Sequence, residues 1–378
     1  MTGRFGRSVR PDAGTVRALL TWFRHGSRPL PWRRNRDPYR VWVAEVLLQQ
    51  TRVEQASPYF ERFVARFPNV RSLAKAPEPD ILKVWEGAGY YARARSLGKA
   101  ARKVVRDHAG AMPRTVLELQ MLPGVGPYIA RAVASIAFNV PVVAMEANGR
   151  RVAARWWAET GNVRQSLVAR ALERHLTDLL PSDSPGEFNE ALMELGEIVC
   201  LPISPRCGRC PVAHTCRAYA TLHDPGSIPA RPAHRPRPHV RAALVVVEAA
   251  GRFLVQRRGP RGLLAGLYEF PGGTIEPGES PEGTARRELE EETGLRRIGP
   301  LESVGVVHHS YSHFRVDLHV YRARLARPRR VRTDHDRRWV SRAGLRRLPL
   351  PRATEKVLDL LRQSDERSGG RRRPPRAR

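Results

Sequence analysis

The sequence predicts a multidomain protein with an all-α first half and an α/β second half. Three observations carry this prediction. Apolar residues recur at helical spacing from about residue 15 to residue 220, a proline-rich stretch follows, and short apolar runs typical of strands come after it. A chain of 378 residues with 41% hydrophobic content has room for two or three domains with cores of their own.

The helical pattern is carried by segments that proline, glycine and aspartate separate: VRALLTWFRHG, YRVWVAEVLLQQTRVEQ, LGKAARKVVRDHAG and NEALMELGEIVC. Beyond the prolines, RAALVVVEAAGRFLVQRRG predicts two strands around a glycine turn, and VDLHVYRARL predicts another. We therefore expect a flexible N-terminus, a helical domain, a stiff linker, an α/β domain and a basic disordered tail, with the bounds 1–14, 15–223, 224–239, 240–361 and 362–378.

The charge of the chain is strongly basic. Lys and Arg number 66 against 37 acidic residues, a formal net charge of +29, and a polyanion such as nucleic acid is the first partner to consider. Only five of the basic residues are Lys, so two explanations stay open: arginine selected for phosphate contacts, or a GC-rich genome. No apolar run approaches the roughly 20 residues of a membrane helix, and the first residues lack a signal-peptide pattern. We expect a cytoplasmic protein without a membrane partner.

All four cysteines lie in one short segment with the spacing C-x6-C-x2-C-x5-C: Cys200, Cys207, Cys210 and Cys216. Such tight local spacing is typical of a metal centre rather than of disulfides. Zinc and a cubane iron–sulfur cluster both accept four sulfurs. Zinc sites usually show two CxxC pairs, and the single pair here favours iron–sulfur.

A glycine-rich turn lies in LPGVGPYIARAV between two helical patterns. Gly124 and Gly126 allow a tight turn with free backbone N–H groups ahead of a helix N-terminus, an arrangement that holds a phosphate. An ordinary helix–helix turn would show the same pattern, so the alternative stays open.

Two carboxylates occupy unusual places in the helical half. Glu45 lies inside the apolar run WVAEVLLQQT, and Glu146 stands between an apolar segment and a basic helix. Burial raises the pKa of a carboxyl group and suits a general acid, although a structural salt bridge would also explain Glu45. Cleavage of an N-glycosidic bond needs an acid for the leaving base and a negative charge against the sugar cation.

Together, AEVLLQQTRV, EGAGYYARARSL, LPGVGPYIARAV, FNEALMELGEIVC and the cysteine loop resemble the MutY-type adenine DNA glycosylases of the helix–hairpin–helix superfamily. The resemblance runs from about residue 15 to residue 220 and continues more weakly through the second half. It implies a helix–hairpin–helix glycosylase domain with a [4Fe–4S] loop, followed by a Nudix-like domain. It also implies base excision repair of adenine mispaired with 8-oxoguanine in double-stranded DNA, by a nucleoid-associated monomer.

The resemblance assigns roles to residues of this chain. Glu45 falls on the general acid, and Tyr128 on a tyrosine that supports the transition state. The positions that contact DNA or the flipped adenine are Gln50, Thr51, Gly124, Gly126 and Glu190, and the four cysteines would ligate the cluster. Bifunctional relatives place a Lys where this chain has Tyr128, and a phenol forms no Schiff base. We therefore expect a monofunctional glycosylase.

One catalytic position departs from the family. Where the family has Asp followed by Gly and Asn, this chain has Glu146, Ala147 and Asn148. The charge is kept on a side chain one methylene longer, and misplacement by about 1 Å costs about a hundredfold in rate. We expect reduced adenine excision that rises in a Glu146→Asp variant, and a mispair-binding protein with weakened catalysis is an alternative.

The second half contains GTIEPGESPEGTARRELEEETGL, which fits the Nudix hydrolase signature at every constrained position: Gly273, Glu279, Arg287, Glu288, Leu289, Glu291, Glu292, Gly294 and Leu295. Glu288, Glu291 and Glu292 share one helix face, where hard oxygen ligands suit Mg²⁺ or Mn²⁺ bridging a diphosphate. In the glycosylase family this domain usually lacks the metal-binding box. An active Nudix nucleoside-diphosphate hydrolase fused to the glycosylase is therefore a second hypothesis.

The same half has Tyr311, Ser312 and His313 where the glycosylase family reads 8-oxoguanine through Phe-Ser-His. Ser and His can hydrogen-bond the altered purine edge, while the aromatic ring packs. The second half is therefore interpreted as a lesion-recognition module, a working hydrolase, or both.

Overall fold

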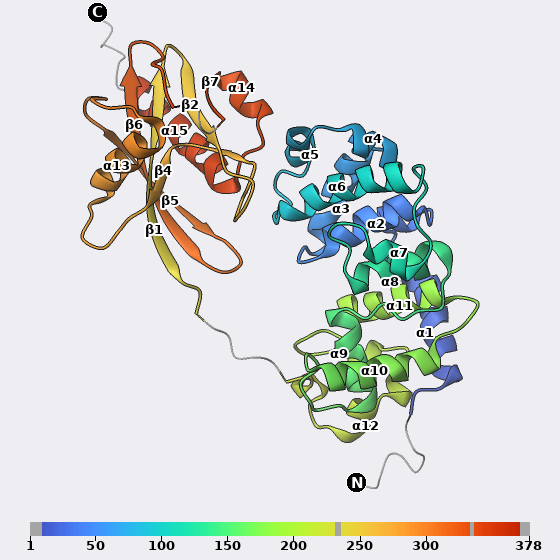
Figure 1. The fold of residues 1–378 in the computed structure, drawn as a ribbon. Coiled ribbons are helices and arrows are strands. Elements are labelled where there is room, and N and C mark those ends of the chain that lie inside the picture. Colours follow the sequence, from blue (N-terminus) through green and yellow to red (C-terminus); the bar gives the residue numbers. More distant parts are fainter. Residues whose placement is uncertain (1–9, 231–235, 333–335, 371–378) are drawn as a thin grey trace, which may run out of the picture. The chain divides into compact units, whose positions relative to one another are not determined.

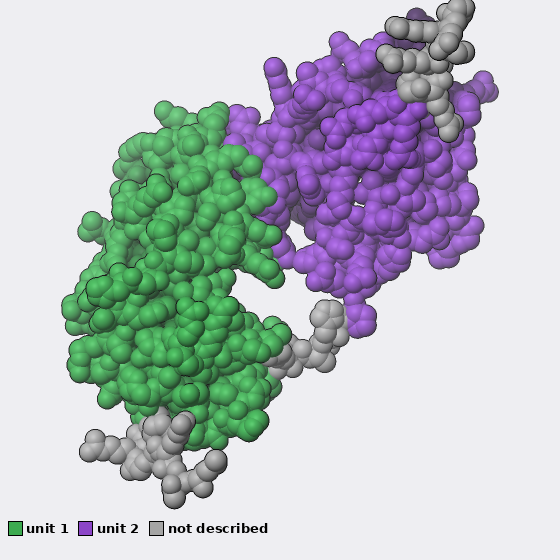
Figure 2. Space-filling view, turned by 180° about the vertical axis from the view of Figure 1, so that it is seen from behind, with its two compact units in different colours: residues 1–75, 96–233 green, residues 76–95, 234–378 purple. Residues whose placement is uncertain are grey.

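The computed structural model describes residues 10–230, 236–332 and 336–370. The chain forms two compact units, shown in two colours in Figure 2. The described residues of the first unit come from Met1–Lys75 and Ser96–Ala233, and those of the second from Ala76–Arg95 and His234–Arg378. The first unit is helical and the second contains a mixed sheet (Figure 1), which confirms the predicted fold class. No helix in the described ranges is long and apolar enough to span a membrane.

The first unit consists of α-helices joined by short turns. Its first helix starts where Asp12 accepts a hydrogen bond from the Thr15 backbone N–H at 2.9 Å, a capping box that satisfies the free N–H groups of the first turn. The helices are α1 (Ala13–Gly26), α2 (Pro38–Leu48), α3 (Val53–Arg66), α4 (Val70–Lys75), α6 (Ala92–Asp107, which belongs to this unit from Ser96 on), α7 (Val116–Gln120), α8 (Pro127–Phe138), α9 (Ala147–Trp157), α10 (Ser166–Leu179), α11 (Pro185–Ile198) and α12 (Arg217–Thr221).

The segment YRVWVAEVLLQQTRVEQ, which the periodicity predicted as one helical run, is two helices. α2 ends at Leu48 and α3 begins at Val53. Between them Gln50 adopts a left-handed φ of +63°. This backbone conformation ends a helix, and residues other than glycine rarely adopt it. The apolar pattern continues through the break, so periodicity alone did not detect it.

Four helices pack together around the middle of the first unit. α8 packs against α2 and α11, and α11 also packs against α9. The approach of α11 to α8 is close, because a Cβ atom at Gly186 would lie 2.5 Å from the Ser135 carbonyl oxygen. Helices that are far apart in the sequence therefore place side chains close together between α2, α8, α9 and α11.

The predicted proline-rich linker is partly packed. Residues Pro225–Ser227 form a 3₁₀ turn, and Ile228 is buried in the core of the first unit. The buried Arg155 side chain donates to the Ile228 carbonyl oxygen at 2.8 Å. The interpretation as a stiff extended spacer is therefore wrong for this first part, while residues 231–235 of the linker lie outside the described residues.

The second unit includes a piece of the first half of the chain, α5 (Glu78–Val84) and its flanks. Within the unit, Glu78 forms an ion pair with Arg257 at 3.1 Å, and Glu86 accepts from the Leu350 backbone N–H at 2.9 Å. The division of the chain thus differs from the boundary expected at 223, because Ala76–Arg95 groups with the later residues.

The sheet of the second unit has seven strands: β1 (His239–Ala249), β2 (Arg252–Arg257), β3 (Tyr268–Glu269), β4 (Gly272–Thr274), β5 (Glu302–Ser310), β6 (Arg315–Leu325) and β7 (Arg337–Ser341). The main order is β3-β2-β1-β6-β5, β4 also pairs with β1, and β7 pairs with β2. β1 and β6 run parallel, and the other pairs are antiparallel. The predicted hairpin is confirmed, since β1 turns into β2 at Ala250 and Gly251, both with positive φ.

Helices cover both faces of this sheet. Alternating β1 residues belong to two separate cores: Leu244 and Val246 pack with α14 (Arg342–Arg347) and α15 (Arg352–Gly370), whereas Val245 and Val247 pack with α13 (Pro281–Thr293). α15 continues through Gly370, so disorder is the wrong prediction for residues 362–370. Asp365 on this extension forms an ion pair with Arg322 of the sheet. Residues 371–378 lie outside the described ranges.

Candidate active site

A cavity of about 1110 Å³ opens among the four packed helices of the first unit. Its wall contains residues of α2, α8, α9 and α11 and of the connection between α2 and α3. Six residues that the sequence singled out line it together: Glu45, Gln50, Thr51, Tyr128, Glu146 and Glu190. The fold therefore gathers in one cavity groups whose sequence positions span 145 residues.

Glu45 is the buried acid of this cavity. It lies on α2 with 4% of its surface exposed, and the Tyr128 hydroxyl donates to its Oε2 atom at 2.8 Å. Burial raises the pKa of Glu45 to about 7, with the charges of Glu146 and Glu190 contributing to the rise and the Tyr128 hydrogen bond and Arg33 opposing it. A carboxyl group with this pKa is largely protonated just below neutral pH, which suits a general acid.

Glu146 stands at the N-terminus of α9 and is half-buried. Its Oε1 atom accepts from the Gly149 backbone N–H at 2.9 Å, so the side chain caps the helix. Burial raises its pKa, although the backbone N–H groups of Asn148 and Gly149 oppose this. The Glu146 side chain, one methylene longer than aspartate, therefore lines the cavity, but its Oε1 atom points toward the N-terminus of α9.

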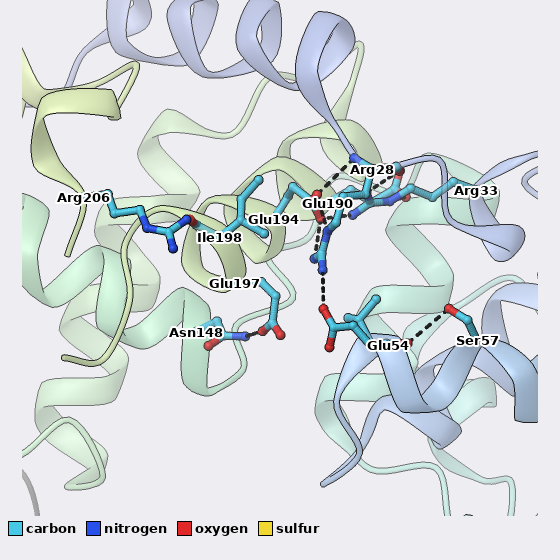
Figure 3. Close-up of polar contacts among 11 residues, drawn as sticks. Arg28, Arg33, Glu54, Ser57, Asn148, Glu190, Glu194, Glu197, Ile198 and Arg206 are labelled. Carbon is cyan, nitrogen blue, oxygen red and sulfur yellow. Dashed lines mark hydrogen bonds and ion pairs between the residues drawn. The ribbon is translucent and has the colours of Figure 1, made fainter. Parts of the chain in front are cut away.

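Carboxylates of α11 form a second wall, and arginines hold them (Figure 3). Arg28 clamps Glu194 with two side-chain hydrogen bonds of 2.8 and 3.0 Å. Arg33 bridges Glu194 at 3.1 Å and Glu190 at 3.3 Å, and Arg36 lies 3.7 Å from Glu190. Burial nevertheless raises the pKa of Glu190.

Sequence reasoning found Glu190 but missed Glu194 and its arginine partners. A signal was present, because Glu190, Glu194 and Glu197 recur at the i, i+4, i+7 spacing that places residues on one helix face. The partners could not be found in this way. Arg28 lies 166 residues from Glu194, and only the packing brings the two together.

The connection between α2 and α3 carries the two residues expected to contact the duplex. Gln50 is exposed and holds the left-handed backbone conformation described above, and Thr51 is half-buried beside it. A strained, exposed polar residue at the rim of a cavity is typical of a binding position.

The glycine turn lies at the start of α8, ahead of Tyr128. Gly124 has a φ of +78°, and a Cβ atom there would lie 2.5 Å from the Ser96 Cβ atom. Gly126 is exposed, and a Cβ atom there would meet nothing within 4 Å. The turn is not part of the cavity wall. Because α8 begins at the turn and carries Tyr128 into the wall, a phosphate bound at the turn would lie at a fixed position relative to Tyr128.

The cysteines lie on the loop after α11, and all four are free thiols. Arg155 donates to the Cys200 Sγ atom at 3.2 Å, and the Cys216 thiol donates to the Arg155 carbonyl oxygen at 3.4 Å. Burial, with a smaller contribution from the charges of the other cysteines, raises the pKa of Cys210 to about 12 and that of Cys216 to about 11. No three His, Cys, Asp or Glu side chains of the described residues are grouped so as to hold a single metal ion.

In the second unit, Arg287 organises the acidic residues of α13. It contacts Glu279 at 2.7 Å, Glu288 at 2.9 Å and Glu291 at 3.1 Å. Its hydrogen bonds lower the pKa of Glu279 to about 2. Glu288 packs beneath Gly273, where a Cβ atom would lie 2.3 Å from the Glu288 carboxyl carbon. Gly273 and Arg287 of the signature thus seat the helix against β4.

Glu291 and Glu292 line a separate cavity of about 630 Å³ in the second unit. Glu292 accepts from the Gly272 backbone N–H at 2.9 Å, and burial raises its pKa. The three predicted metal ligands are not grouped around one ion site in the described structure: Glu288 does not line this cavity, and Arg287 contacts both Glu288 and Glu291.

The Tyr-Ser-His segment lies in the turn between β5 and β6. Tyr311 is half-buried and lines the same cavity as Glu291 and Glu292. Ser312 and His313 are exposed at the tip of the turn, where the Ser312 hydroxyl and the His313 Nδ1 atom lie 2.8 Å apart. Phe314, which sequence reasoning missed, also lines the cavity and stacks on Tyr311.

Comparisons with known proteins identify both halves of the chain. The model of the "HhH-GPD superfamily base excision DNA repair protein" family matches residues 43–177, and that of the "NUDIX domain" matches residues 242–360. The adenine DNA glycosylase of Mus musculus is 34% identical over 405 residues, covering 93% of this chain and 78% of the mouse protein. That of Homo sapiens is 33% identical over 395 residues, covering 90% of this chain and 72% of the human protein. The solved structure of a thermostable thymine-DNA glycosylase aligns with a TM-score of 0.50 and 31% identity, covering 54% of this chain and 94% of that one.

Proposed function

Because the chain belongs to the adenine DNA glycosylase family, we propose that it binds double-stranded DNA and excises adenine mispaired with 8-oxoguanine. The single observation that carries the proposal is Glu45, a buried acid with a raised pKa in a cavity large enough for a flipped base. The Tyr311, Ser312 and His313 segment of the second unit supports the choice of 8-oxoguanine as the opposing base, because its tip exposes a hydroxyl and an imidazole.

The contacts of Glu45 define how it acts as the acid. The Tyr128 hydroxyl donates to Oε2, so the carboxyl proton resides on Oε1, which can deliver it to a ring nitrogen of adenine. Protonation turns the base into a better leaving group, and the N-glycosidic bond breaks with positive charge developing on the sugar. Glu146, when ionised, stabilises that charge. Water then adds to the sugar, its released proton returns to the Glu45 carboxylate, and an abasic site is left.

The reaction stops at the abasic site in this proposal. A glycosylase that also cuts the strand needs an amine to form a Schiff base. Among the described residues that line the cavity none is lysine, and the position in question is Tyr128. This supports monofunctional chemistry.

A duplex with adenine opposite 8-oxoguanine is expected to yield abasic product that breaks only after alkali treatment. Borohydride should trap no covalent complex, and duplexes with adenine opposite thymine should react far more slowly. The measurement is single-turnover excision followed on a denaturing gel. Strand cleavage without alkali, accompanied by borohydride trapping, would refute the monofunctional assignment.

We also propose that the four cysteines bind a [4Fe–4S] cluster. The support is the donor set: four free thiols within electrostatic reach of one another, one of them accepting an N–H from Arg155. A cubane takes one sulfur on each iron, so its ligands need not meet at a single ion. When bound, the cluster would hold the loop after α11 in shape, and no catalytic step passes through it.

The purified protein is expected to be brown and to contain about four irons per chain. Cys207→Ser should lose the colour and most of the iron, since one ligand is removed. Ile203→Ala, an exposed residue of the same loop, serves as the matched control and should keep both. A colourless wild-type protein that contains one zinc would be inconsistent with the proposal.

A second function is supported by the cavity of the second unit, which has two carboxylates of an intact Nudix signature, Glu291 and Glu292, in its wall. We propose that this unit hydrolyses nucleoside di- or triphosphates. For a triphosphate, water cleaves the bond between the α- and β-phosphates and yields the monophosphate, pyrophosphate and a proton. As placed, the carboxylates do not form a three-ligand metal site, so no step is assigned to a metal. The test of this activity accompanies the experiment below.

A further inference from the structure

Two features that lie about twenty residues apart in the sequence share the cavity of the second unit. The carboxylates Glu291 and Glu292 of α13 form part of its wall, and the aromatic residues Tyr311 and Phe314 form another part. The first pair comes from the Nudix signature, and Tyr311 comes from the segment interpreted as the lesion reader. A volume of about 630 Å³ lies within the range of small-ligand sites.

The aromatic part of the wall is rigidly built. The rings of Tyr311 and Phe314 stack at 4.7 Å with an angle of 30° between their planes, and His309 meets Tyr311 edge-on at 4.6 Å. The Tyr311 backbone N–H donates to the Phe314 carbonyl oxygen at 2.9 Å, which closes the turn between the strands. Tyr311 and Phe314 together give the cavity a preordered aromatic surface, and every nucleobase offers a π-face that can pack against such a surface.

The remaining wall carries charges of both signs. Arg258 grips Glu269 with two contacts of 2.8 and 2.6 Å, and Arg261 is exposed at the same cavity. Arg337 lies near the carboxylates and donates to Gln256 at 3.2 Å. Arginines suit phosphate oxygens, and carboxylates suit a divalent cation that accompanies a polyphosphate.

Tyr311 is close enough to Glu269 and Arg258 for their charges to change its pKa. Burial raises the pKa of Tyr311 to about 12, with the charge of Glu269 contributing to the rise and Arg258 opposing it. The phenol is therefore neutral at physiological pH, and a base can stack on it without meeting a phenolate.

We propose that this cavity binds a free purine nucleotide, with the base against Tyr311 and the phosphates toward Glu291 and Glu292, and that this nucleotide competes with a lesion base of DNA for Tyr311. The proposal deepens the hydrolase function of the second unit and rests on it for the ligand class. The predicted competition also requires that the turn between β5 and β6 contact the lesion base through Tyr311. The consequence is that free nucleotide weakens mispair recognition.

The test uses the full-length protein and α,β-methylene-dGTP, an analogue that cannot be cleaved at the α–β position. Calorimetry with Mg²⁺ should show binding of the analogue, and Tyr311→Ala should weaken it about tenfold, the loss typical of a removed stacking partner. Tyr311→Phe keeps the ring and should bind like wild type. Unchanged affinity in Tyr311→Ala, or no binding of the analogue to the wild type, overturns the proposal.

Competition is measured with a duplex carrying 2′-fluoro-deoxyadenosine opposite 8-oxoguanine, which resists excision. Saturating analogue should raise the apparent Kd for this duplex severalfold and leave that for an undamaged duplex unchanged. His313→Ala is the matched control, because His313 is exposed at the tip and outside the cavity wall. It should weaken binding of the lesion duplex without changing binding of the analogue. An additive, non-competitive response overturns the shared use of Tyr311.

Hydrolysis is followed separately as pyrophosphate release from 8-oxo-dGTP and dGTP, in the wild type and in Glu292→Gln. If the analogue binds and competes but no pyrophosphate is released, the hydrolase function fails and the inference stands. If pyrophosphate is released, is lost in Glu292→Gln, and has an unchanged KM in Tyr311→Ala, the hydrolase function stands and the inference fails.

Discussion

Glu45→Gln is expected to lower the single-turnover rate of adenine excision by about 10²- to 10⁴-fold, the usual contribution of a general acid. The amide keeps the shape of the side chain and can still accept from Tyr128, but it has no acidic proton to give to the base. Affinity for the mispair should change little. The comparison needs excision rates and duplex Kd values for both proteins, with the exposed Glu61→Gln on α3 as the matched control.

The pH dependence of the wild type follows from the same group. Burial raises the pKa of Glu45 to about 7, and the active form is the protonated one. The rate should therefore fall as the pH rises through about 7, and Glu45→Gln should lack this limb. The groups that face Glu45 are Tyr128, Glu146, Glu190 and Arg33. A rate in Glu45→Gln within tenfold of wild type, with the same pH profile, would assign the acid elsewhere.

The second large effect is expected at Glu146. Glu146→Asp should raise the excision rate, by up to about a hundredfold if the longer side chain misplaces the charge by about 1 Å. The structure gives this expectation a physical basis, because one carboxylate oxygen of Glu146 accepts the Gly149 N–H as a helix cap. Aspartate caps a helix equally well from a shorter side chain, so the charge would move while α9 stays capped.

Glu146→Gln separates charge from capping. It keeps an oxygen for the Gly149 N–H and removes the negative charge, so we expect the excision rate to fall while the melting temperature stays near that of the wild type. Single-turnover rates and thermal denaturation of the three proteins are the measurements. A Glu146→Asp rate no higher than wild type, in a protein that melts normally, would show that the backbone already compensates for the extra methylene.

Patterns within a short stretch of chain predicted much of this fold. The helical spacing of 15–220, the hairpin at Gly251 and the helix of the Nudix signature all appear in the structure. Each depends on neighbours within a turn of helix or across a tight turn, which is the range that sequence patterns record. Sequence analysis missed the helix break at Gln50 because apolar periodicity does not record where the backbone φ becomes positive. It missed the extension of α15 because composition does not show that Asp365 forms an ion pair with Arg322.

The amino-acid sequence by itself determined which chemistry this protein carries: the acid Glu45, the phenol Tyr128, the four grouped cysteines and the nine signature residues around Glu291. Only the tertiary structure decided which of these groups act together. Tyr128 meets Glu45 across 83 residues of chain, Arg28 meets Glu194 across 166, and Tyr311 shares a cavity with Glu291. The physical reason is that pKa values, ion pairs and cavities arise from burial and distance, and close packing sets both of these between elements that no local pattern connects.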